Sequence, residues 1–229
     1  MDATDLSSEE SRRTQSGRRA RSARFLREPF TIIRADVGVY LVMNVLMYGL
    51  SIAGFVTALI FPELNAAQVA SLENDGTADL VVSLLSNVWL FALVILGVNT
   101  LTVGALSILL PSMIVPFAGI AVFAYRAFTI GLTLAPADET GWVALIPHFL
   151  TYLIEFQAYV LLVFGAYLLG RSWLRPATIG AGNRRQGYVR GLQQVGWLSP
   201  PALALFIVGA IYETFSLSYL VPPLVHWMI

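Results

Sequence analysis

The sequence predicts an all-α polytopic membrane protein: a bundle of five transmembrane helices, with the amino terminus in the cytoplasm and the carboxyl terminus outside. Of its 229 residues, 57% are hydrophobic and only 12% are charged, and the mean hydropathy is +0.71. A soluble domain carries about 25% charged residues, so half of the expected solvating surface is missing. Long apolar runs and the segregation of arginine to one side of them are the other two observations behind this prediction.

The amino-terminal residues 1–24 are polar and rich in arginine, and they are predicted to form a disordered cytoplasmic tail. Residues 25–229 are predicted to form a single membrane domain. It opens with a short aromatic and apolar segment, 25–33, whose arginines suit an anionic membrane surface. The first apolar run follows and ends before Pro62, and it is too long for the apolar core of a signal peptide.

No charged residue occurs between Leu80 and Tyr125, a run far longer than the roughly 20 residues that one crossing needs. Pro111, Ser112 and Pro116 form the helix-breaking cluster inside this run, so a tight hairpin is predicted at 111–112. The remaining apolar runs are bounded by proline or by charged residues. The five predicted spans are 37–61, 88–110, 113–134, 145–169 and 200–221.

The charges are distributed unequally between the two ends of these spans. All fourteen basic residues are arginines, and thirteen of them fall in the amino-terminal region or in a predicted cytoplasmic loop at 171–197. The opposite connections carry no arginine and hold the acidic residues Glu63, Glu73, Asp75, Asp79, Asp138 and Glu139. Because cytoplasmic loops are enriched in basic residues, the amino terminus is predicted to be inside, in a multi-pass protein of the inner (plasma) membrane.

Three ionisable side chains fall inside the predicted spans: Arg126, Glu155 and Glu213. At 1.5 Å per residue they lie about 12, 15 and 12 Å below the outer ends of their helices, which is nearly the same layer of the membrane. Such groups are costly in a bilayer unless they have a partner or a water-lined site. A pair between Arg126 and one glutamate is expected, and it leaves one carboxylate that must take up a proton or bind a cation or polar partner.

His148 lies on the same helical face as Glu155, and Asn99 lies in the second span, so both are added to this predicted intramembrane polar cluster. Three interpretations stay open: the cluster fixes helix packing, it forms an ion or proton pathway, or it recognises a partner. A metal site is not favoured, because His148 and Glu155 are about 10 Å apart along the helix axis.

No catalytic constellation is present. The absence of cysteine and lysine excludes thiolate sites, disulfides and Schiff-base chemistry, and no nucleophile elbow, phosphate loop or zinc helix occurs. We therefore expect no enzymatic activity, no cofactor and no metal.

The predicted loop 171–197 places aromatic and apolar residues among arginines. One interpretation is an interfacial connector held by anionic lipid headgroups, and the other is a docking surface for a protein partner such as a cytoplasmic ATPase. Nucleic-acid binding has no supporting fold or aromatic platform. The candidate docking residues are Arg171, Arg175, Arg184, Arg185 and Arg190.

Short motifs across residues 86–222 resemble the stage II sporulation protein M family. The resemblance is carried by Pro147-His148 followed by Glu155 and the glycine-rich helix end at 164–170, by an Asn87-led second span, and by a second glutamate in the closing segment 209–215. The histidine lies two turns before the glutamate, whereas the family pattern has it one turn before. Arg126 stands where the family commonly has asparagine followed by glycine.

The resemblance implies a five-span inner-membrane protein without enzymatic activity. Family members in spore formers anchor peptidoglycan-remodelling enzymes at the septal membrane, and elsewhere they are associated with AAA-type ATPases. We therefore expect a scaffold or assembly subunit of a cell-envelope complex, with protein partners and with a homo-oligomer left open. The alternative is a small transporter or ion-conducting subunit that uses Arg126, Glu155 and Glu213.

Overall fold

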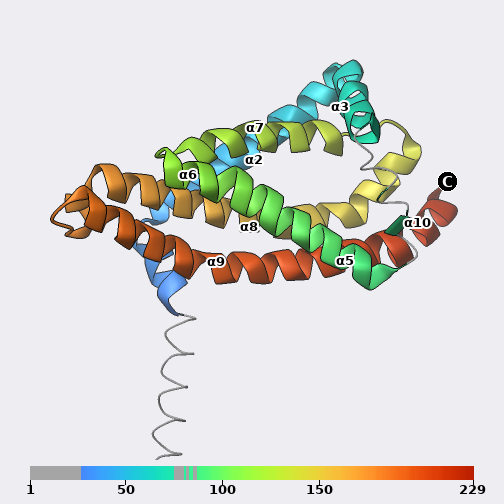
Figure 1. The fold of residues 1–229 in the computed structure, drawn as a ribbon. Helices are drawn as coiled ribbons and strands as arrows, with labels where there is room; N and C mark the ends of the chain where they lie inside the picture. Colours follow the sequence, from blue (N-terminus) through green and yellow to red (C-terminus); the bar gives the residue numbers. More distant parts are fainter. Residues whose placement is uncertain (1–26, 75–79, 81–82, 85–86) are drawn as a thin grey trace, which may run out of the picture. The chain divides into compact units, whose positions relative to one another are not determined.

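The computed structural model describes residues 27–74, 80, 83–84 and 87–229, so the predicted tail 1–24 lies outside the described residues. The described residues are helical, with no strand among them (Figure 1), which confirms the all-α class. The chain divides into two compact units, Met1–Gly38 and Val39–Ile229. The division falls inside the region predicted as one membrane domain. In the first unit, residues 27–35 are helical.

The second unit contains nearly all of the named helices. In chain order they are α2 (Val37–Ile60), α3 (Pro62–Asn74), α5 (Val88–Gly97), the π-helix η1 (Val98–Leu109), α6 (Leu110–Ile114), α7 (Ala118–Leu134), α8 (Glu139–Leu174), the 3₁₀ turn η2 (Pro176–Ile179), α9 (Arg184–Phe215), the π-helix η3 (Ser216–Leu220) and α10 (Val221–Met228).

Four helices are long and apolar enough to cross a membrane, by their length and composition. They are Val37–Ile60, Val88–Ile114, Glu139–Leu174 and Arg184–Met228. A fifth apolar helix, α7, is shorter at 17 residues. These helices indicate a membrane protein, and each contains or overlaps one of the predicted spans.

The hairpin predicted at 111–112 is wrong, because helix continues through Pro111 as far as Ile114. Pro111 lies at the junction of the π-helical segment η1 and α6, where the regular α-helical hydrogen-bond pattern is already interrupted. The chain reverses instead at Phe117, whose φ of 68° is left-handed. The Phe117 ring packs on Tyr167, with ring centroids 5.8 Å apart, and it also lies against Gly170.

The predicted loop at 171–197 is also mostly helix. α8 continues to Leu174, and α9 begins at Arg184, where the Asn183 side chain accepts a hydrogen bond from the Gln186 N–H at 2.9 Å. The connection is therefore only nine residues long, 175–183. Of the arginines in the predicted loop, Arg184, Arg185 and Arg190 lie on the amino-terminal half of α9, a helix of 32 residues.

α8 is the central helix, and α9 packs antiparallel along it. The α9 residues that face α8 recur every three or four positions and are mostly small: Gly187, Gly191, Val195, Leu198, Ala202, Phe206 and Gly209. A Cβ on Gly187 would overlap the Ser172 carbonyl oxygen, and one on Gly191 would lie 2.9 Å from the Leu169 Cα. Glycine therefore permits direct contact between the two backbones.

Candidate functional site

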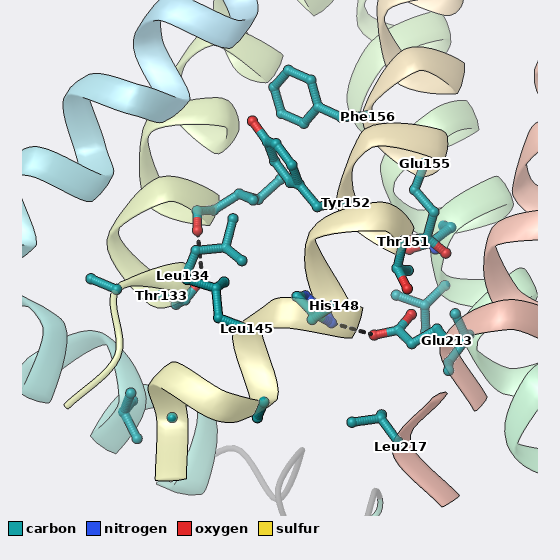
Figure 2. Close-up of a pocket in the computed structure, with 18 of the residues that line it drawn as sticks. Thr133, Leu134, Leu145, His148, Thr151, Tyr152, Glu155, Phe156, Glu213 and Leu217 are labelled. Atoms are coloured by element: carbon teal, nitrogen blue, oxygen red, sulfur yellow. Dashed lines mark hydrogen bonds and ion pairs between the residues drawn. The ribbon is translucent and has the colours of Figure 1, made fainter. Parts of the chain in front are cut away.

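A cavity of about 800 Å³ lies among α5, η1, α7, α8 and the end of α9 (Figure 2), and we refer to it as the polar cavity. Every member of the predicted intramembrane polar cluster lines it. These residues are Asn99 from η1, Arg126 from α7, His148 and Glu155 from α8, and Glu213 from α9. Helices far apart in the sequence thus direct polar side chains into one space.

α8 supplies one complete wall of the polar cavity. Its lining residues recur with each turn of the helix, singly or as adjacent pairs, which places them on one broad helical face. In order along the helix, the wall includes Gly141, Leu145, His148, Thr151, Tyr152, Glu155 and Tyr159.

We refer to the end of the cavity at the α7–α8 connection as its mouth and to the end at Glu155 as its floor, and Asn65, Thr133 and Asp138 bring polar groups to the mouth. The connection from α7 to α8, 135–138, belongs to the lining and marks the mouth. Glu155 lies 17 residues along α8 from Asp138, about 25 Å of helix, and Arg126 lies about 12 Å from the Leu134 end of α7. α9 is antiparallel to α8 and continues into η3, so Leu217 lies nearer the mouth of the cavity than Glu213 does. The residues between mouth and floor are mainly apolar.

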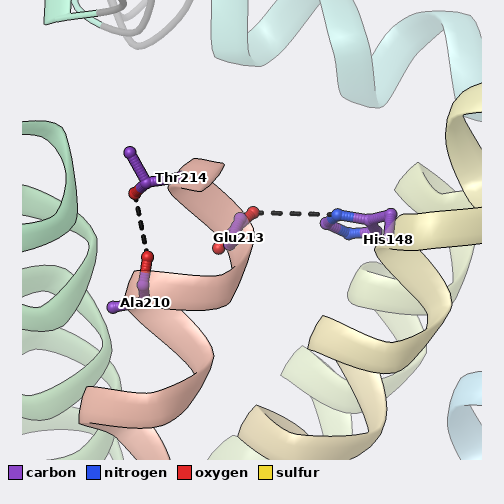
Figure 3. Close-up of polar contacts among 4 residues, drawn as sticks. All are labelled: His148, Ala210, Glu213 and Thr214. Atoms are coloured by element: carbon purple, nitrogen blue, oxygen red, sulfur yellow. Dashed lines mark hydrogen bonds and ion pairs between the residues drawn. The ribbon is translucent and has the colours of Figure 1, made fainter. Parts of the chain in front are cut away.

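Glu213 is paired with His148 across the space between α9 and α8. Its Oε1 lies 3.8 Å from His148 Nδ1, and the two side chains are 17% and 35% exposed, respectively (Figure 3). Within the described part of the chain, Arg126 forms no ion pair with either glutamate, so the expected arginine–glutamate pair is replaced by a histidine–glutamate pair. Pro147, inside α8, directly precedes His148 and removes one helical N–H there.

The floor of the cavity is closed by one hydrogen bond. The Tyr159 hydroxyl donates to Asn99 Oδ1 at 2.8 Å, and both side chains are buried. Beyond this bond α8 is tightly packed, since Val160, Val163, Phe164 and Leu168 have no solvent-exposed surface. The Tyr159–Asn99 bond and this packed stretch of α8 therefore bound the polar cavity at its floor.

Three polar atoms at the floor lack a hydrogen bond of normal geometry: Asn99 Nδ2, Thr151 Oγ1 and Glu155 Oε1. The Asn99 and Glu155 side chains are close enough to interact with each other, whereas Thr151 Oγ1 has no polar contact. Asn99 is 9% exposed and Thr151 is 1% exposed, so bulk solvent does not satisfy them. Buried polar groups are normally hydrogen-bonded, and leaving one unpaired costs about 1–3 kcal/mol. Figure 2 shows Thr151 and Glu155 projecting from α8 on the side that faces Glu213. The floor thus offers donors and acceptors that something other than this chain can satisfy.

Gly209 makes room for Glu155. A Cβ at position 209 would overlap Glu155 Cγ and lie 3.0 Å from its Oε1. The absence of a side chain at position 209 therefore leaves space on α9 for the Glu155 side chain.

π-helical winding occurs on two sides of the floor. Asn99 lies in η1, a segment of 12 residues, and η3 begins three residues after Glu213. π-helical turns are rare and are frequently found at functional sites. They also change the direction in which the following side chains point, so a regular period of about 3.6 residues does not predict which way those side chains face.

The predicted docking arginines lie around the turn from α8 to α9, away from the polar cavity lining. Arg175, Arg184 and Arg185 are exposed. Arg190 donates a hydrogen bond to the Ile179 carbonyl at 2.6 Å, and the Arg171 guanidinium lies 5.8 Å from the Tyr167 ring centroid. Arg171 and Arg190 therefore help to hold the turn, while the other three present free charge at the surface.

Sequence reasoning did not identify Tyr159 and Gly209 as parts of the site. Tyr159 is four residues after Glu155 on the same helical face, a signal that could have been used. Gly209 could not be found in this way, because its role depends on a side chain of another helix.

Among the described residues, no three histidine, aspartate or glutamate side chains are grouped closely enough to hold a metal ion. Comparison with known proteins finds no match: no family model, no curated protein and no solved structure matches this chain.

Proposed function

We propose that this protein is a small polytopic transport protein of the cell's inner membrane, in which Glu155 and Glu213 bind a cation or a proton within the bilayer. The observation that supports this function is the polar cavity, whose floor combines two carboxylates with polar atoms that lack a hydrogen bond of normal geometry. Helix-locking ion pairs alone need no cavity, because paired groups are normally packed against each other. Intramembrane ionisable residues that face a cavity typically mark ion or proton pathways.

The proposed topology has five crossings, with α7 as the short one. Its 17 residues span about 25 Å, close to the roughly 30 Å of the hydrocarbon core. With the arginine-rich amino terminus in the cytoplasm, the α8–α9 turn is also cytoplasmic, and the mouth of the polar cavity faces outside. The proposed substrate path therefore starts outside and reaches the Tyr159–Asn99 bond.

Flux through the purified protein in liposomes tests this function. With an entrapped pH dye and a potassium-diffusion potential, we expect proton flux above that of empty liposomes. Glu155→Gln and Glu213→Gln should each reduce it about tenfold or more, whereas Glu63→Gln, on an exposed surface, should leave it unchanged. Wild-type flux no higher than that of empty liposomes, for protons and for monovalent cations, would contradict the proposal.

A scaffold or assembly subunit of an envelope complex, as in the stage II sporulation protein M family, is the second candidate. The exposed Arg175, Arg184 and Arg185 at one turn are the observation in its favour. This function predicts that the protein, extracted in mild detergent, co-purifies with an ATPase activity. Arg184→Gln combined with Arg185→Gln should abolish the co-purified activity, while Glu155→Gln should retain it.

A further inference from the structure

The polar cavity is much larger than a bare ion requires. A water molecule occupies about 30 Å³ of the liquid, whereas this cavity has about 800 Å³. Sites for organic ligands span roughly 300–1,000 Å³. Metal coordination does not account for the space either, since the described residues provide no group of three suitable side chains.

Two walls of the cavity are apolar toward the mouth and polar at the floor. On α5 and η1, Phe91, Ile95 and Val98 precede Asn99, and at the end of α9 Leu217 lies nearer the mouth than Glu213. Asn65, Thr133 and Asp138 add polar groups to the lining near the mouth. A molecule that matches the two walls has a polar head and a compact hydrocarbon body.

The floor specifies the charge of that head. It has two carboxylates against one guanidinium and the imidazole of His148, which is paired with Glu213. Glu155 Oε1 accepts no hydrogen bond of normal geometry. Thr151 Oγ1, which lacks a partner, can accept a second hydrogen bond. Tyr159, one turn after Glu155 on α8, adds an aromatic ring to the lining at the floor, and such rings attract ammonium groups.

From this arrangement we propose that the polar cavity binds an amphipathic organic cation, a lipophilic ammonium compound whose head group lies between Glu155 and Glu213. This substrate class rests on the transport site proposed above. The ammonium donates to Glu155 Oε1 and Thr151 Oγ1, and the hydrocarbon body lies along the apolar walls toward the mouth. Because Arg126 also lines the cavity, an anionic head group is the competing possibility. The test below therefore includes an anionic compound.

Three compounds with the same hydrocarbon cage and different head groups test the proposal. The wild-type protein in lipid nanodiscs is heated with 1-adamantylamine, 1-adamantanol or 1-adamantanecarboxylate, and unfolding is followed by tryptophan fluorescence. We expect the amine alone to raise Tm saturably, by roughly 5 °C or more at a concentration about a hundredfold above Kd. The alcohol controls for partitioning into the bilayer, because it is neutral and enters lipid more readily than the amine.

Variants then locate the binding site. Glu155→Gln and Glu213→Gln should lose the amine-induced shift, and Glu63→Gln should retain it in full. An equal or larger shift with the alcohol or the carboxylate, or no shift with the amine, would overturn the proposal even if the variants fail to fold. Cation or proton flux without an amine-induced rise in Tm would refute the proposed ligand class but not the proposed transport function. An amine-induced shift without flux of any cation, the amine included, would refute transport and leave the ligand class standing.

Discussion

The two halves of α8 have similar apolar sequences but opposite surroundings. From Val160 to Leu169 the helix is enclosed, and it contacts α9 through glycine and other small residues. From Gly141 to Tyr159 the same helix forms a wall of the polar cavity. The difference lies in the neighbouring helices, because small residues of α9 permit backbone contact in one half, and polar side chains and π-helical segments keep the other half open. Hydrophobicity therefore favours a membrane location for α8 as a whole. The residues of the neighbouring helices determine which half of α8 is buried in packing and which half lines the polar cavity.

The largest expected effect is in the enclosed half. Gly187→Ala places a methyl group on the Ser172 carbonyl and should destabilise the protein by about 2 kcal/mol or more. Gly196→Ala, on the same helix with open space at its Cβ, should be neutral or stabilising by up to about 1 kcal/mol. Thermal unfolding of both variants in one detergent measures the contrast, and equal losses would show that the contact between the two backbones is not what stabilises this half.

At the boundary between the halves, Gly209→Ala should act on function more than on stability. The added methyl group overlaps Glu155 and pushes its carboxylate away from α9. We expect cation or proton flux to fall roughly tenfold, equivalent to about 1.4 kcal/mol, with a smaller loss of stability because a flexible side chain can move. Gly97→Ala has open space at its Cβ and is the matched control. Normal flux in Gly209→Ala would show that the position of Glu155 does not matter.

Much of the membrane architecture could be predicted from the sequence, because apolar runs and helical rise fix where each helix lies. The same arithmetic placed Arg126, Glu155 and Glu213 in one layer, and all three line the polar cavity. However, α8 begins at Glu139 and not at 145, so Glu155 lies about 25 Å from the α7–α8 connection and Arg126 only about 12 Å. The partner of Glu213 could not be predicted, because pairing depends on rotation about the helix axis. The π-helical segments η1 and η3 alter that rotation, and the apolar composition around them carries no signal for π winding.

The turns were predicted less well than the helices. Pro111 was interpreted as a helix breaker, but it lies at the junction of η1 and α6, where the regular α-helical pattern is already interrupted. Gly187 and Gly191 lie in the segment that was predicted as a loop, and glycine has low helix propensity when it is considered alone. Their role in α9 depends on the backbone of Ser172 and Leu169 in the facing helix. Helix boundaries that depend on long-range packing were therefore predicted wrongly from local sequence.

A smaller effect is expected at the floor. Tyr159→Phe removes the hydrogen bond to Asn99 Oδ1 and should cost about 1 kcal/mol of unfolding free energy. If the Tyr159–Asn99 bond limits passage beyond the polar cavity, proton flux should rise in the same variant. Tyr125→Phe, on an exposed surface, should change neither quantity. Lower flux in Tyr159→Phe would instead indicate that the hydroxyl belongs to the conducting path.

The smallest effect tests whether the floor is built for binding at the expense of stability. Thr151→Val keeps the side-chain shape and removes a buried hydroxyl without a partner, so it should raise the unfolding free energy by about 0.5–1 kcal/mol. Thr214→Val removes a buried hydroxyl that donates to the Ala210 carbonyl at 2.8 Å, and it should lower stability by about 1 kcal/mol. Opposite signs in thermal unfolding, together with a weaker amine-induced shift in Thr151→Val, would show that the Thr151 hydroxyl serves a ligand. A loss of stability in both variants would show that the hydroxyl serves the fold.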